Sequence, residues 1–126
     1  MATLKNNSTL NKAKVIVDIL PKGHCIPNQT INATEIAIHN TGDWNVPAAN
    51  YATALKRFNK ENPSWQASYH FVVDDKEIYQ LVDTSKKAWH VGNYNSKAVG
   101  IEICMFKDEA RQKQAEDNAI ALVLEL

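Results

Sequence analysis

The sequence is poor in the features that mark disulfide-rich, membrane and nucleic-acid-binding proteins. Its two cysteines, Cys25 and Cys104, form no disulfide framework and do not have the spacing of a zinc knuckle. Fourteen acidic residues balance fourteen basic ones without a basic run, which argues against a nucleic-acid partner. No apolar run approaches the length of a membrane span, and residues 1–14 are polar. We therefore expect no membrane association, no signal peptide and synthesis in a cytoplasm.

The residues that are present predict a single domain of strands and helices. A chain of 126 residues can bury roughly two thirds of the surface that it exposes when unfolded. Alternating or continuous apolar runs predict strands, and Asp74 to Lys76 predict a hairpin turn. Helical spacing follows Pro47 and again follows Asp108, and Pro and Gly mark a long loop. The predicted strands cover 15–20, 35–39, 68–73, 77–82 and 99–106, the helices 47–59 and 108–126, and the loop 21–32.

His39 is the first candidate functional residue. It ends a β-branched strand and is followed by small polar residues, for which we predict a turn at 41–45. A buried strand of this kind delivers one imidazole to the rim of a cleft. The alternative is a hydrogen-bonded histidine without a functional role, and the residue alone does not decide between them.

Glu102 is the second candidate, because it is the one charge in an apolar strand. Burying a carboxylate costs several kcal/mol unless it is paired, coordinated or protonated. A salt bridge or an edge-strand position would remove that cost. If Glu102 instead faces a cleft, desolvation raises its pKa and suits it to act as a general base on water.

Two pairs of neighbouring residues place further candidates. Tyr69 and His70 point to opposite faces if they lie on a strand, so only one of them can face a site. Trp89 and His90 follow the same rule, and either could stack on or hydrogen-bond a substrate. The four histidines lie in separate segments without ligand spacing, so spacing alone predicts metal binding only weakly.

Five of these segments, taken in order, resemble the landmarks of the zinc-dependent N-acetylmuramoyl-L-alanine amidases. This family includes phage endolysins and the peptidoglycan recognition proteins. The match spans about residues 15–126, and the long loop around His24 is most similar to endolysins of phages and prophages of Gram-positive hosts. The landmarks read IAIHNT at 36–41, ASYHFVV at 67–73, IYQ at 78–80, AWHVG at 88–92 and VGIE at 99–102.

The resemblance implies an α/β fold, with a mixed central β-sheet flanked by helices and a Zn²⁺ ion in a groove that binds peptidoglycan. It implies hydrolysis of the amide bond between N-acetylmuramic acid and L-alanine by a protein made in the bacterial host cytoplasm that acts on the cell wall. The resemblance makes His39 a metal ligand and makes Glu102 and Tyr69 catalytic residues. It assigns substrate binding to Thr41, Trp44, Trp89 and His90.

The chain departs from the family pattern at its end. The second zinc ligand of the family is a histidine and the third a cysteine or aspartate, and both follow the helix at which this chain stops, as does a basic residue. That helix has no glycine cap and ends in an apolar run from Ile120 to Leu126. We therefore expect residues 1–126 to be one amidase domain that lacks its C-terminal segment, with weak or absent zinc binding and impaired activity.

Two other functions remain open at this point. A non-catalytic peptidoglycan-binding module would keep the groove without the ligands. Alternatively, the chain could self-associate through the apolar stripe of its last helix.

Overall fold

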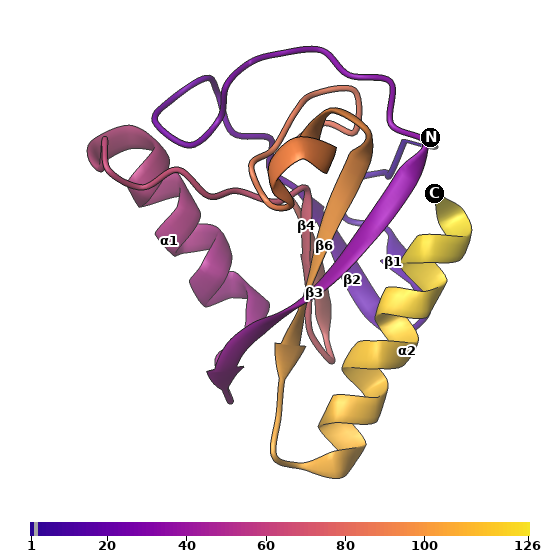
Figure 1. Ribbon diagram of the computed structural model, residues 1–126. Helices are drawn as coiled ribbons and strands as arrows, with labels where there is room; N and C mark the ends of the chain where they lie inside the picture. The colour runs from indigo at the N-terminus through magenta and orange to yellow at the C-terminus, as the bar shows by residue number, and fades with distance from the viewer. Residues whose placement is uncertain (2) are drawn as a thin grey trace.

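The computed structural model describes residue 1 and residues 3–126. Within these residues, a six-stranded sheet lies between two helices (Figure 1). In chain order the elements are β1 (Thr9–Leu10), β2 (Ala13–Val17), β3 (Glu35–Trp44), α1 (Ala48–Glu61), β4 (Phe71–Val73), β5 (Glu77–Gln80), the 3₁₀ helix η1 (Gly92–Ser96), β6 (Ala98–Met105) and α2 (Glu109–Glu125).

The sheet is mixed, with the strand order β1-β2-β5-β4-β6-β3. β4 and β5 form the predicted antiparallel hairpin, while β6 runs parallel to both β4 and β3. β3 therefore lies at one edge of the sheet, and β6 is its inner neighbour. The predicted α/β fold with a mixed sheet flanked by helices is confirmed.

Alternating residues of the central strands divide the core into two clusters. Val72 packs in the cluster that holds Leu55 of α1, while Phe71 and Val73 pack in the cluster that holds Leu122 of α2. Successive side chains of a strand point to opposite faces. Helix α1 therefore covers one face of the sheet and α2 the other, as Figure 1 shows.

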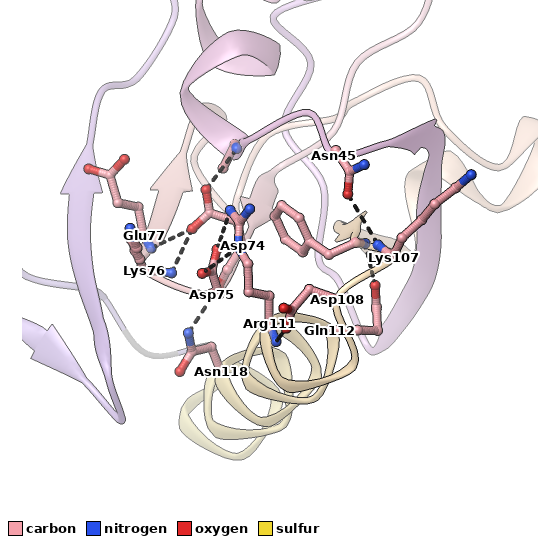
Figure 2. A network of polar contacts seen from close by, with 12 residues as sticks. Asn45, Asp74, Asp75, Lys76, Glu77, Lys107, Asp108, Arg111, Gln112 and Asn118 are labelled. Carbon is pink, nitrogen blue, oxygen red and sulfur yellow. Dashed lines mark hydrogen bonds and ion pairs between the residues drawn. The ribbon is translucent and has the colours of Figure 1, made fainter.

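A buried aspartate joins the start of α1 to the β4–β5 turn (Figure 2). Asp74 accepts hydrogen bonds from the backbone N–H of Ala48 at 2.9 Å, of Lys76 at 2.8 Å and of Glu77 at 2.7 Å. The first N–H groups of a helix have no partner inside the helix, so the carboxylate satisfies one of them and complements the helix dipole. Pro47, the N-cap residue of α1, makes no such side-chain bond.

Helix α2 is tied to the same turn. Its N-cap, Asp108, accepts a hydrogen bond from Arg111 N, and the Arg111 guanidinium pairs with Asp75 at 3.0 Å. The fully buried Asn118 donates to the backbone oxygen of Asp74 at 3.0 Å (Figure 2). The turn after β4 thus fixes both helices at one end of the sheet.

Several predicted boundaries were wrong. The predicted turn at residues 41–45 is strand as far as Trp44, because β3 continues pairing with β6 after an irregularity between Asn40 and Trp44. The strand predicted at 68–73 begins only at Phe71, and the strand predicted at 15–20 lies at Ala13–Val17. Trp89 and His90 lie on no strand, so the alternation expected for them was wrong, and both side chains line the groove described below. Strand β1 was not predicted. In the described part of the chain, no helix has the length and apolar character needed to cross a membrane.

Candidate functional site

A groove of about 690 Å³ opens on the α1 side of the sheet. Its floor comes from the parallel strands β3 and β6, where His39 and Glu102 are register partners. Thr41 and Glu102 both line the groove, as alternation along each strand requires. The two candidates found far apart in the sequence are therefore neighbours in the sheet.

The walls of the groove come from α1 and from two loops. Tyr51, Leu55 and Phe58 lie one or two helical turns apart and form the α1 wall. The loops meet where Ser68 and Trp89 exchange hydrogen bonds, each of 2.9 Å. The lining residues contributed by the loops are Trp65, Gln66, Ala67, Ser68, Tyr69, Trp89 and His90, and η1 adds Gly92 and Asn95.

The carboxyl group of Glu102 is the most unusual electrostatic feature of the groove. Its Oε2 atom is buried and has no hydrogen-bond partner among the described residues. Desolvation by burial raises the pKa of Glu102 from 4.5 to about 7. Near neutral pH the group can therefore both take up and release a proton, which is the property of a general acid–base catalyst.

Three residues with hydroxyl groups line the same groove. Thr41 Oγ1 is buried and, within the described chain, lacks a hydrogen-bond partner. Tyr69 donates a long hydrogen bond of 3.4 Å to the backbone oxygen of Tyr51, and burial together with nearby Glu102 raises the pKa of Tyr69 well above its ordinary value. Tyr51 itself donates to Asp43 at 2.7 Å. Tyr69 is therefore a neutral donor at physiological pH.

Tyr69 and His70 have different surroundings, although neither lies on a strand because β4 begins at Phe71. Tyr69 lines the groove, whereas His70 is fully buried. His70 Nε2 donates to Lys86 O at 2.7 Å, and His70 Nδ1 accepts from Gly100 N at 3.0 Å. Burial lowers the pKa of His70 to about 4, so it stays neutral and serves the structure.

His90 lies between the other two imidazoles. His90 Nδ1 is 3.3 Å from His39 Nε2, and His90 Nε2 is 3.2 Å from Ala98 O. The ring packs edge-on against His39 and against His70, with centroid distances of 5.5 and 5.7 Å. The three histidines thus lie in contact in the order His70, His90 and His39, with the fully buried His70 at one end.

The donor groups do not form a complete zinc site. A catalytic zinc ion takes three protein ligands and a water. The described residues contain no group of three His, Cys, Asp or Glu side chains placed to hold one ion. His39 and His90 are hydrogen-bonded to each other, and both cysteines are buried in the core beside α1.

Most of the residues predicted for the site are brought together, with one exception. His39, Thr41, Tyr69, Trp89, His90 and Glu102 lie in or directly beside the groove. Trp44 does not line it; the residue is 53% exposed at the end of β3, and the Lys107 ammonium group lies 5.7 Å from the centroid of its ring. The functional roles of all seven residues stay predictions.

Sequence reasoning missed part of the wall. Tyr51 and Phe58 lie on one face of the predicted helix, and their spacing fits a groove wall as well as a core face. Trp65 lies in a loop without any sequence pattern, and its ring packs at a tilt against Phe58 with the centroids 4.7 Å apart. Asn95, whose Oδ1 accepts from the backbone N–H groups of His90 and Val91, carries no sequence signal.

Comparison with known proteins gives a family and close structural neighbours. A profile described as N-acetylmuramoyl-L-alanine amidase matches residues 29–126. The chain is 38% identical over 122 residues to N-acetylmuramoyl-L-alanine amidase CwlA of Bacillus subtilis strain 168, covering 90% of this chain and 42% of that protein. It is 38% identical over 95 residues to XlyA of the same strain, covering 71% of this chain and 31% of that protein. The chain thus spans about two fifths or less of these curated relatives.

Solved structures agree with the sequence comparison. The catalytic domain of XlyA superposes with a TM-score of 0.76 at 33% identity, covering 88% of this chain and 73% of that one. The Drosophila peptidoglycan recognition protein SD has a TM-score of 0.68 at 17% identity, covering 90% and 73%. The second likeness concerns the fold alone.

Proposed function

Because the chain belongs to the N-acetylmuramoyl-L-alanine amidase family, we propose that its groove binds peptidoglycan and that it takes part in cleaving the amide bond between N-acetylmuramic acid and L-alanine. The observation that carries this proposal is Glu102. Its carboxyl group lies on the floor of the groove, one oxygen has no partner in the described chain, and its pKa is about 7.

Glu102 has the properties needed to move the proton of this hydrolysis. A water oxygen attacks the carbonyl carbon of the amide while Glu102 takes a proton from that water. Glu102 then gives the proton to the leaving nitrogen as the C–N bond breaks, which regenerates the carboxylate and releases a new L-alanine amino group. A pKa near the working pH suits both steps.

The surrounding side chains have donors and surfaces for the substrate. We assign Thr41 Oγ1 to a substrate amide or hydroxyl group, because it is buried in the groove lining, its polar neighbour is the Tyr51 hydroxyl, and it completes no hydrogen bond of full geometry within the described residues. Tyr69, held neutral by its raised pKa, can donate to an oxygen that gains negative charge. Trp89 offers an apolar face for a sugar or a peptide.

The incomplete donor set limits what these 126 residues do alone. The family resemblance implies zinc, for which His39 would be one ligand, and the other ligands would have to come from outside the described residues. We therefore propose that the chain binds zinc weakly and hydrolyses its substrate slowly. Elemental analysis after dialysis tests the first statement, and near one zinc per chain would contradict it.

The hydrolysis experiment uses purified Gram-positive peptidoglycan and follows new N-terminal L-alanine by amine labelling and mass spectrometry. The chain is assayed with added Zn²⁺ and with a chelator, beside Glu102→Gln and the matched control Glu35→Gln, which changes an exposed residue of β3. We expect slow release that rises with Zn²⁺, is unchanged in the control and falls about 100-fold or more in Glu102→Gln. New reducing sugar ends, or equal rates in both variants, would contradict the proposal.

A second candidate function is a peptidoglycan-binding module without catalysis, which the incomplete donor set favours. Such a module would co-sediment with insoluble peptidoglycan and release no new amino groups at any zinc concentration. Trp89→Ala should weaken that retention, because Trp89 is a large groove-lining side chain.

Self-association through α2 is a separate proposal. Ile120 and Leu124 lie one helical turn apart and are 58% and 81% exposed. Sedimentation velocity over a range of concentrations tests whether this stripe pairs. If wild type and Leu124→Glu are both monomeric throughout, the proposal is wrong.

A further inference from the structure

Both ring nitrogens of His90 contact protein atoms, and these contacts decide where its proton lies. A carbonyl oxygen only accepts hydrogen bonds, so the 3.2 Å contact with Ala98 O assigns the proton to His90 Nε2. In a neutral imidazole the other nitrogen then carries a lone pair. His90 Nδ1 is therefore the acceptor in its 3.3 Å contact with His39 Nε2.

The same reasoning extends to His39. If His90 Nδ1 accepts, then His39 Nε2 must carry the proton that is donated. The lone pair of His39 is thereby assigned to Nδ1, which makes no hydrogen bond within the described residues. The backbone oxygen of Ala98 thus determines the tautomer of His39 through one intervening ring.

The His90 ring is held firmly enough for this purpose. Gly100 lies directly beneath it, and a Cβ atom there would come within 2.6 Å of His90 Nδ1 and 2.7 Å of Cγ. The backbone N–H of His90 donates to Asn95 Oδ1 at 2.9 Å. His70, which is itself bonded at both nitrogens, packs against the His90 ring at an interplanar angle of 88°, with the ring centroids 5.7 Å apart. A ring in this cradle has little freedom to rotate.

We propose that His90 is a positioning residue that fixes the ring orientation and the tautomer of His39, so that His39 keeps Nδ1 as its free lone pair. This role differs from the substrate-binding role that the family resemblance assigns to His90. It rests on the proposed function only for the use made of that lone pair, as a ligand or as a hydrogen-bond acceptor. The arrangement of the two rings is a property of the chain without substrate.

The test is ¹⁵N NMR of the imidazole rings at pH 8.5, about two units above the ordinary imidazole pKa. The variants are His90→Phe, which keeps a ring above Gly100 but removes both hydrogen bonds, and His24→Phe, a matched change in an exposed loop. The buried His70, with its proton on Nε2, provides an internal reference for a native fold.

In the wild type and in His24→Phe, we expect His39 and His90 each to show one protonated Nε2 and one unprotonated Nδ1. In His90→Phe, the His39 nitrogens should move toward the averaged shifts of a mobile imidazole, and the His39 Nε2 proton should exchange with water about 10-fold faster. His70 should be unchanged. Gly100→Ala should move His39 in the same direction, because its methyl group displaces His90.

A proton on Nδ1 of His39 or of His90 in the wild type would overturn the inference. So would His39 signals in His90→Phe that match the wild type while His70 remains native. These spectra need no substrate and no hydrolysis. A chain that gives the expected spectra but releases no L-alanine would contradict the proposed function alone.

Discussion

Replacing Glu102 by Gln should stabilise the fold at pH 8 more than at pH 4.5. The pKa of Glu102 is raised to about 7 in the folded chain, from an ordinary value of 4.5. Well below pH 4.5 the carboxyl group is protonated in both states and carries no charge penalty. Between pH 4.5 and 7 the unfolded chain loses the proton and the folded chain keeps it, so stability falls as the pH rises.

The size of the effect follows from that shift. Each pKa unit corresponds to about 1.4 kcal/mol, so the full shift would amount to about 3 kcal/mol. Glu102 is only partly buried, and screening by water in the groove reduces this to about 1–2 kcal/mol. Gln has nearly the same shape and no charge, so its stability has no such pH dependence.

Urea denaturation of wild type and Glu102→Gln in metal-free buffer at several pH values measures the difference directly. All other titrating groups are shared and cancel in that difference. The stability gap should widen by about 1–2 kcal/mol between pH 4.5 and 8 and stay constant above that. Glu35→Gln, on the exposed end of β3, should show no widening. A Glu102→Gln gap that is the same at every pH would refute the argument from desolvation.

Three further predictions concern the packing of the fold. Asp74→Ala leaves three backbone N–H groups without their acceptor and should lower the free energy of unfolding, measured by urea denaturation, by about 3–5 kcal/mol. The control is Asp117→Ala, which removes the surface ion pair with Lys113 and should cost less than about 1 kcal/mol. Gly23→Ala places a Cβ atom 2.5 Å from the backbone oxygen of Asn59. It should lower the free energy of unfolding, measured by urea denaturation, by about 1–3 kcal/mol. Leu122→Ala, in the core under α2, should cost about 2–5 kcal/mol by the same assay, and a cost below 1 kcal/mol would mean that α2 is loosely packed.

The elements that depend on local pattern could be predicted from the sequence. The β4–β5 hairpin, α1, β6 and α2 were all recognised, because each has a clear period or a clear turn. The extension of β3 could not be recognised from Thr41, Gly42 and Asp43, which have the composition of a turn. Gly42 adopts a φ of 78°, and the resulting irregularity lets the strand resume pairing at Trp44. Pairing with a distant strand overrode the local preference.

The candidate site was predictable only in part for a similar reason. His39 and Glu102 are visible in the sequence because each is a polar residue in an apolar strand. The contact between His39 and His90 depends on the path of the loop before η1, which no periodicity reports. Gly100 is the sequence feature that points to this contact, because a glycine inside a buried strand indicates a close approach by another group.

β6 shows how the fold separates stability from chemistry. Val99 and Ile101 are fully buried in the cluster beneath α2, whereas Gly100 and Glu102 face the histidines and the groove. A slip of one residue in the register of β6 would exchange these two sets. The register with β4 is therefore as important to the site as Glu102 itself. Asp74 follows β4 directly and binds the start of α1, so its loss should disturb the groove as well as the stability of the fold.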